Sequence, residues 1–140
     1  VSGLTNAEIA GPGTVDTSGL DGIRLELLTV SGVPTVSVTD MTVLDSTDVG
    51  IHVRNNGVTV GDITISDNTV DQSGDQGILA NLSGTSGAVT ADGNTVSSSG
   101  SNGVELFLTG LNTGGADVTV SNSTISDSAG NGLLIDSFLS

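Results

Sequence analysis

The residues best suited to acid–base chemistry in this 140-residue chain are Arg24, Glu26, His52 and Arg54. His52 is the single histidine, and the two arginines are the only other cationic side chains. Histidine titrates near neutral pH, so His52 is a candidate catalytic acid or base, with Glu26 as the candidate carboxylate. The simpler interpretation is a surface ion pair beside a solvated histidine, since exposed ion pairs contribute only about 0–1 kcal/mol.

A second set of candidates is acidic and would bind calcium. Hard cations prefer carboxylate oxygens, and five aspartates fall in one recurring segment: Asp45, Asp48, Asp71, Asp75 and Asp127. Single aspartates are also common turn formers, and the chain contains no Asp-x-Asp-x-Asp-Gly calcium loop. Two interpretations therefore remain open, a calcium site and ordinary turns.

The segment that positions all these residues is a repeat with the skeleton Thr-Val-x-x-Ser-x-x-x-Gly-Ile. It begins at Thr14, Thr42, Thr69, Thr95 and Thr124, with spacings of 28, 27, 26 and 29 residues. A fixed period of this size is typical of solenoids and other repeat architectures. Apolar residues alternate with polar ones on both sides of the motif, which favours short strands over helices.

These features predict an all-β fold, a right-handed single-stranded parallel β-helix of about five coils of roughly 27 residues. Each coil is expected to hold three short strands. Residues 1–13 are expected to be an irregular lead-in, with a short strand near Ile9 and a turn at Gly11-Pro12-Gly13. Residues 14–140 form the repeats, as a segment of a longer chain or as a subunit that stacks on others.

Stacking coils places equivalent residues in contact at about 4.8 Å. We expect apolar columns at the Val of Thr-Val and at the Ile after Gly, and a ladder of the equivalent Asn68 and Asn94. Hydrogen bonds between serine hydroxyls are expected from coil to coil. The repeated glycine is expected where the backbone needs a positive φ or where a Cβ has no room. In the same register Glu26 lies opposite Arg54, and Arg24 lies opposite His52.

The segments Gly-Ile-x-Val and Val-Thr-Ile-Ser-Asp-Asn-Thr-Val (63–70) resemble the parallel β-helix repeat of the pectate-lyase-like superfamily. This resemblance covers roughly residues 14–136 and is specific for fold. It implies a range of activities that includes polysaccharide lyases, glycoside hydrolases, phage tailspikes and adhesins. Enzymes of this type use clustered carboxylates on one sheet, whereas here the aspartates are scattered singly and tryptophan and tyrosine are absent.

The net charge of −14 argues against nucleic acid as a partner, and no apolar run approaches the 18–20 residues of a membrane helix. We therefore expect a structural or adhesive rod segment of an extracellular or cell-surface protein. Its expected partners are further copies or neighbouring coils at its ends, and polysaccharide. The alternatives are a carbohydrate-active β-helix enzyme and a phage tail fibre or tailspike segment. No cofactor other than calcium is expected.

Overall fold

The computed structural model describes residues 6–28, 32–84, 87–110 and 117–138. Within these ranges every regular element is a β-strand, and every strand pairing is parallel. One sheet, here called sheet A, contains β1 (Asn6–Asp16), β3 (Thr35–Leu44), β5 (Ile63–Ser66), β6 (Thr69–Asp71), β8 (Val89–Asp92), β9 (Thr95–Ser97), β11 (Val118–Ser121) and β12 (Thr124–Ser126). The other, sheet B, contains β2 (Ile23–Leu27), β4 (Ile51–Asn55), β7 (Ile78–Ser83), β10 (Val104–Thr109) and β13 (Leu133–Phe138).

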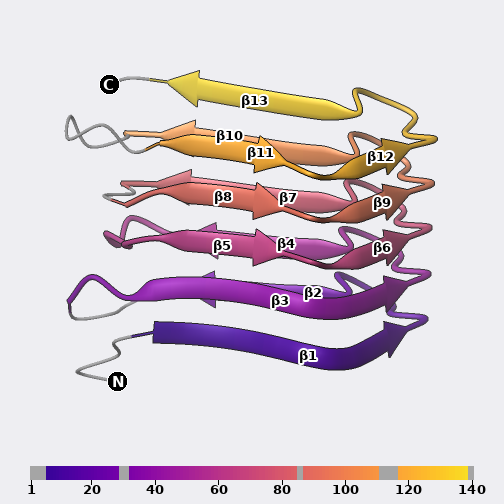
Figure 1. The fold of residues 1–140 in the computed structure, drawn as a ribbon, viewed down its shortest axis with the longest axis horizontal. Helices are drawn as coiled ribbons and strands as arrows, with labels where there is room; N and C mark the ends of the chain where they lie inside the picture. Colours follow the sequence, from indigo (N-terminus) through magenta and orange to yellow (C-terminus); the bar gives the residue numbers. More distant parts are fainter. Residues whose placement is uncertain (1–5, 29–31, 85–86, 111–116, 139–140) are drawn as a thin grey trace.

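The chain alternates between these sheets and climbs one level with each circuit, which makes a β-solenoid (Figure 1). In Figure 1 the strands of sheet A run left to right in front, and those of sheet B return behind them as the chain rises. That path is right-handed, as crossover connections between parallel strands nearly always are. The predicted fold is therefore confirmed.

The structure has about four turns, slightly fewer than the predicted five coils. The five copies of the motif mark the boundaries of four complete periods, which explains the difference. Three strands per coil appear as expected in the later coils, where sheet A has two arms, one formed by β5, β8 and β11 and the other by β6, β9 and β12. In the first coils β1 and β3 each run unbroken through both arms.

The expected turn at Gly11-Pro12-Gly13 lies inside β1 and takes the form of a strand irregularity. The register of β1 against β3 shifts between Ala10 and Gly13. Proline lacks an N–H for the sheet ladder, so an edge strand with a local bulge accommodates it. Residues 1–5 of the predicted lead-in lie outside the described residues.

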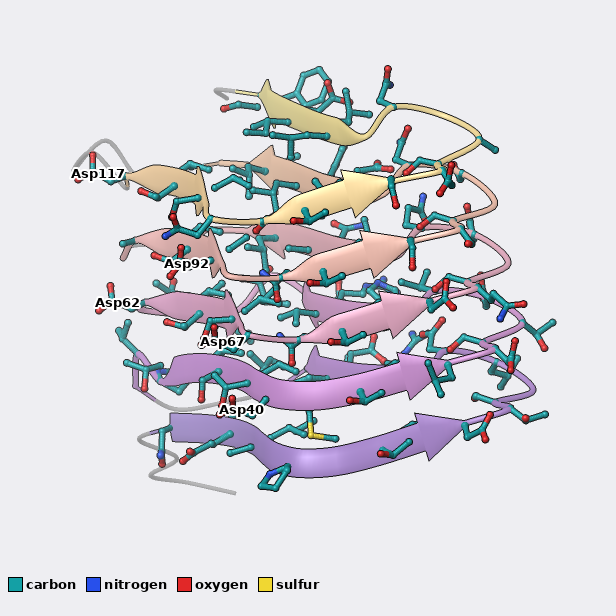
Figure 2. The ribbon with its side chains drawn as sticks, turned by 45° about the vertical axis from the view of Figure 1, so that its right-hand side comes forward. Asp40, Asp62, Asp67, Asp92 and Asp117 are labelled. Atoms are coloured by element: carbon teal, nitrogen blue, oxygen red, sulfur yellow. The ribbon has the colours of Figure 1, made fainter. Side chains whose placement is uncertain are left out.

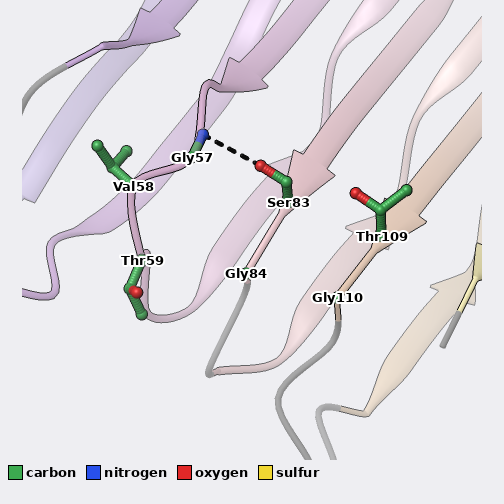
Figure 3. Close-up of a pocket in the computed structure, with 7 residues that line it drawn as sticks. All are labelled: Gly57, Val58, Thr59, Ser83, Gly84, Thr109 and Gly110. Atoms are coloured by element: carbon green, nitrogen blue, oxygen red, sulfur yellow. Dashed lines mark hydrogen bonds between the residues drawn. The ribbon is translucent and has the colours of Figure 1, made fainter. Parts of the chain in front are cut away.

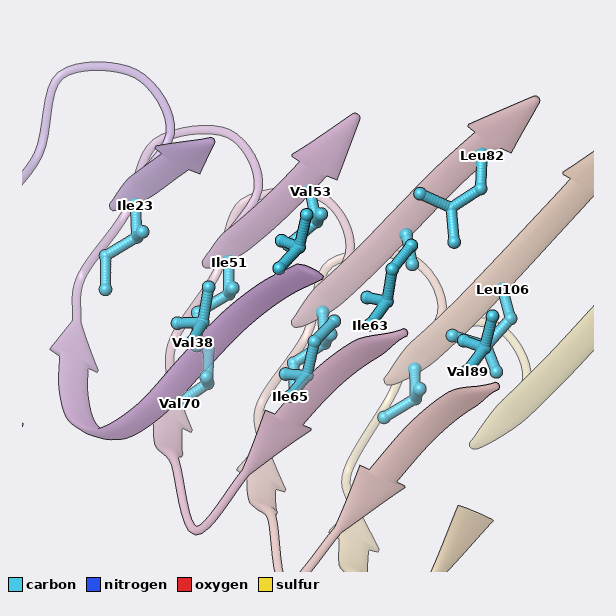
Figure 4. Packing of buried hydrophobic residues seen from close by; sticks show 14 of the residues in the cluster. Ile23, Val38, Ile51, Val53, Ile63, Ile65, Val70, Leu82, Val89 and Leu106 are labelled. Carbon is cyan, nitrogen blue, oxygen red and sulfur yellow. The ribbon is translucent and has the colours of Figure 1, made fainter. Parts of the chain in front are cut away.

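The core fills the space between the two sheets with columns of equivalent side chains, seen side by side in Figure 4. One column contains Val43, Val70 and Val96, and each of these side chains is 0% exposed. Another contains Ile51 and Ile78, also 0% exposed, and Val104. Register-matched strands bring these residues together as predicted. Burying each such side chain contributes about 1.5–3 kcal/mol.

The repeated glycine is required by a close approach between coils. A Cβ on Gly77 would overlap Val96 Cγ1 and lie 2.7 Å from the Gly103 carbonyl oxygen and 2.8 Å from Ser99 Oγ. All three atoms belong to the next coil. Of the two reasons predicted for this glycine, lack of room for a Cβ is the one that applies.

The asparagine ladder is confirmed and joins coils at the corner between the two arms of sheet A. Asn68 Nδ2 donates to Asn94 Oδ1 (3.0 Å) and to the Val38 carbonyl (3.0 Å), while Asn68 Oδ1 accepts the Met41 N–H (3.0 Å). Asn94 Oδ1 in turn accepts the Asn68 N–H (3.1 Å). Each asparagine therefore satisfies backbone groups that the bend would otherwise leave unpaired.

The predicted serine ladder is wrong. Ser18 Oγ, the first of the row, donates to the Asp21 carbonyl of its own coil (2.7 Å). The other four hydroxyls are buried and find no hydrogen-bond partner in the described part of the chain: Ser46, Ser73, Ser99 and Ser128. Each lies against the glycine of the preceding coil, where only a small side chain fits. Serine therefore suits this row because its side chain is small, and its hydroxyls do not link the coils.

Candidate functional site

A largely buried polar contact between coils joins Asp21 and His52. Asp21 precedes β2, and its Oδ2 lies 3.1 Å from His52 Nδ1 on β4 in the next coil. Both side chains are largely buried, with 5% and 11% exposed, respectively. Because a carboxylate only accepts, Nδ1 carries a proton in this contact.

Two arginines extend this pair into a charged network, named here the Asp21–Arg54 network. Arg24 Nη1 lies 3.3 Å from Asp21 Oδ2, and Arg24 Nη2 lies 3.2 Å from Glu26 Oε2. Arg54 Nη1 is 3.6 Å from Glu26 Oε1 across adjacent coils, as predicted. The hydrogen bond to Glu26, with a smaller contribution from Asp21, raises the pKa of the Arg24 guanidinium above its ordinary value.

Asp21 is the member of this network that the sequence did not single out. It lies one residue before the repeated Gly22, in a turn, where strand alternation gives no information about direction. The same position in a later coil behaves alike, because Gln76 Nε2 donates to Glu105 Oε2 of the next coil (3.1 Å). Asp21 could therefore have been found from a repeated pairing. The residue just before the repeated glycine of one coil pairs with the second residue after the repeated glycine of the next coil.

The geometry limits what His52 can do as an acid or base. Its Nε2 atom is buried and has no hydrogen-bond partner among the described residues. A general base must come within hydrogen-bond reach of the proton that it removes. Beside the network is a depression of about 200 Å³ lined by Leu20, Asp21, Arg24 and Asp48, and His52 is not part of its lining.

The predicted calcium candidates lie in the turns and at the strand ends of successive coils. Asp71 lies opposite Leu44 and Ser97, and its carboxylate accepts the Ser97 hydroxyl at 2.7 Å. That hydrogen bond lowers the pKa of Asp71 below its ordinary value, although partial burial opposes the shift. Asp45 has a left-handed backbone with φ of 52°, as expected for a turn former.

Two pairs of these candidates meet through backbone hydrogen bonds between adjacent coils: the Asp45 N–H donates to the Asp71 carbonyl (3.1 Å), and the Asp75 N–H donates to the Asp48 carbonyl (3.2 Å). Asp127 has φ of 52° in the equivalent turn of the last coil. Within the described ranges no three His, Asp or Glu side chains are grouped closely enough to hold a metal ion.

Other aspartates follow the opposite side of the solenoid, at the corner and loop end of sheet A (Figure 2). Asp40 and Asp67 adopt left-handed φ of 56° and 55° at the corner. Asp62 Oδ1 accepts the Ala88 N–H of the next coil (2.9 Å), and Asp92 Oδ1 accepts the Ser121 hydroxyl (2.6 Å). The Ser121 hydrogen bond lowers the pKa of Asp92 below its ordinary value. Sequence reasoning overlooked these residues, which act as turn formers and as links between coils.

A groove of about 310 Å³ runs across three coils where β4, β7 and β10 end (Figure 3). Glycines at equivalent positions line it, and all have positive φ: Gly57 (72°), Gly84 (76°) and Gly110 (58°). The hydroxyl-bearing residues Thr59, Ser83 and Thr109 line it, and Ser83 Oγ accepts the Gly57 N–H (3.2 Å). Residues 111–116, which follow Gly110 in the chain, lie outside the described residues.

Comparison with known proteins leaves the geometry as the main guide to function. Among the described residues there is no helix long and apolar enough to span a membrane. No family model, no curated protein and no solved structure matches this chain.

Proposed function

We propose that this chain is a structural and adhesive rod segment of an extracellular or cell-surface protein. The observation that carries the proposal is the continuity of the core from coil to coil. The same columns run from β1 and β2 to β12 and β13, and each level repeats the contacts of the level below. Stability in such a stack accumulates through neighbouring coils, which suits a rod of adjustable length.

The Asp21–Arg54 network supports a structural role over catalysis. Two of its pairs, Asp21–His52 and Glu26–Arg54, join the first two coils, and Arg24 pairs with Glu26 within one coil. The buried Nε2 of His52 is turned away from solvent. The groups that the sequence suggested for acid–base chemistry are thus occupied in holding one coil on the next. Membership of the pectate-lyase-like superfamily is part of the proposal, supported by the stacked coils and by the Asn68–Asn94 ladder.

The adhesive contact in this proposal is the groove of Figure 3. Its hydroxyls and exposed backbone suit the hydroxyl groups of a polysaccharide, and its open shape spans several coils. A chain with net charge −14 favours neutral glycans over acidic ones.

A paired assay of binding and turnover on neutral and acidic polysaccharides tests this function. We expect binding without release of new sugar ends. Thr109→Val, which keeps the side-chain shape but removes a groove hydroxyl, should weaken binding severalfold, while His52→Ala should leave binding unchanged. Sugar release that disappears in His52→Ala would overturn the structural proposal.

That outcome would favour the second candidate, a carbohydrate-active enzyme. The observation behind this candidate is the Asp21–His52 hydrogen bond next to a surface depression, since a carboxylate that orients a histidine is a common catalytic arrangement. Glu26→Gln would then lower turnover together with His52→Ala.

A further inference from the structure

The two ends of the stack expose side chains at positions that are buried in every middle coil. The upper end face is formed by Val118, Val120, Ile125, Leu133 and Ile135 on β11, β12 and β13. Leu133 is 42% exposed and Ile135 45%, whereas their equivalents Ile78 and Ala80 are 0% exposed. The strands of this face have a paired neighbour on one side only within the described ranges.

The lower end face carries the same repeat positions, on β1 and β2. It is formed by Ala7, Ile9, Val15, Ile23 and Leu25, four of which are only partly buried. Continuing the observed register by one coil would bring Val15 of a second copy onto Ile125, and Ile23 onto Leu133. Inside the stack the same contacts are Val96 on Ile125 and Val104 on Leu133. The two end faces are thus complementary in the way that neighbouring coils are.

Gly132 provides an independent steric argument. A Cβ on Gly103 would overlap Ile125 Cγ2 and lie 2.7 Å from both the Gly132 carbonyl oxygen and Ser128 Oγ. A Cβ on Gly132 would meet only Ile125 Cγ2, at 3.7 Å, among the described residues. The surface above Gly132 therefore has the shape that receives a Val, a Ser and a Gly from another coil, and the lower end face supplies them as Val15, Ser18 and Gly22.

We propose that the upper end face binds the lower end face of a second copy of this chain, so that β1 and β2 extend sheets A and B. The inference deepens the proposed rod function by naming its partner. Such a contact is heterologous, and its repetition generates an open filament. Glu26 of the second copy would face Asp136, and two chains of charge −14 repel each other, so assembly should strengthen as salt rises.

Disulfide trapping tests this contact, since the chain has no cysteine of its own. Thr14→Cys and Thr124→Cys, introduced in separate chains, should lie opposite each other across the junction. Adjacent parallel strands are about 4.8 Å apart, which is within the Cα separation that a disulfide spans. Mixing the two variants under mild oxidation in high salt should give mostly the mixed dimer.

Matched controls make the result specific. Thr69→Cys with Thr95→Cys in one chain occupies the same row within the stack and should close an internal disulfide. Thr119 lies on β11 and not on β12, so a Thr119→Cys thiol is not opposite Thr14 across the junction. Mixing Thr14→Cys with Thr119→Cys should therefore give at least tenfold less mixed dimer. Adding Gly132→Ala to the Thr124→Cys chain should abolish trapping without lowering its melting temperature in dilute, low-salt solution, where neither chain assembles.

Trapping of the Thr14–Thr124 pair no better than the Thr14–Thr119 control would overturn the proposal. A predominance of Thr124–Thr124 dimers would also overturn it, because that product requires two upper faces to meet. Neither result depends on sugar turnover, so failure of this contact is distinguishable from failure of the proposed function.

Discussion

The middle of the stack and its upper end use the same residues in different surroundings. Gly103 and Gly132 occupy one repeat position, yet a Cβ is sterically excluded at the first and accommodated at the second. Ile78 and Leu133 occupy another, with exposed fractions of 0% and 42%. The difference arises from the next coil, which covers Gly103 and Ile78 but is missing above the last described level.

This contrast teaches that a residue's role in the solenoid is set by its neighbour one coil away. A motif residue contributes its full stability only where a coil lies on both sides. Substitutions at equivalent positions should therefore have large effects in the middle and small effects at the end.

The largest effect is expected for Gly77→Ala. Its Cβ would overlap Val96 and crowd the Gly103 carbonyl, so the free energy of unfolding should fall by about 3 kcal/mol or more. Denaturant titration followed by circular dichroism measures this loss. Gly132→Ala is the matched control and should leave stability within about 0.5 kcal/mol. Equal losses in the two variants would contradict the close approach between coils.

A similar contrast is expected for cavity formation in the core. Leu106→Ala removes a side chain that is 0% exposed and should lower the free energy of unfolding by about 2–5 kcal/mol. Ile135→Ala lies at the equivalent position on β13, where 45% of the residue is exposed, and should cost about 1 kcal/mol. Thermal and denaturant unfolding measure the loss of stability in both variants. A larger loss for Ile135→Ala than for Leu106→Ala would contradict the difference between the middle and the end of the stack.

The asparagine ladder should show the same gradient at a smaller scale. Asn68→Ala leaves the Met41 N–H and the Val38 carbonyl without their partners, and should cost about 2 kcal/mol. Ser123 ends the ladder by accepting the Asn94 N–H at 3.2 Å, so Ser123→Ala removes one bond and should cost about 1 kcal/mol. Amide hydrogen exchange at Met41 would locate the lost protection, and unchanged exchange there would count against the ladder.

The smallest effect concerns acid stability through Asp71. Because the Ser97 hydroxyl lowers the pKa of this carboxyl, its stabilisation is present above the ordinary aspartate pKa and is lost as pH falls through the lowered value. Below about pH 4, Asp71→Asn should therefore lose stability less steeply than the unaltered chain. Ser97→Ala should flatten the same slope, and melting curves at several pH values measure both. An unchanged slope in both variants would show that this link does not contribute.

The sequence was sufficient to predict the features set by the repeat. The constant distance from Thr to Gly and the alternation of apolar residues predicted the stacked parallel strands, the columns and the register, including Glu26 opposite Arg54. The Asn68–Asn94 ladder followed from the same register.

The turns were harder to predict because alternation gives no side-chain direction outside a strand. Asp21 was missed since it reaches His52 from a turn in the preceding coil. Ser73 was expected to pass a hydrogen bond along the stack, yet its hydroxyl lies against a glycine and has no partner in the described ranges. Packing at the glycine corner, which the sequence does not display, decides the orientation of that row.

Sedimentation velocity over a range of protein and salt concentrations is the most direct test of the claim that one coil contact operates both within and between chains. We expect the unaltered chain to form species larger than a monomer that grow with concentration and salt, and Gly132→Ala to remain monomeric. In dilute, low-salt solution, where assembly does not contribute to stability, the two should have the same melting temperature. A monomer under all conditions, or Gly132→Ala assembling as well as the unaltered chain, would contradict the account.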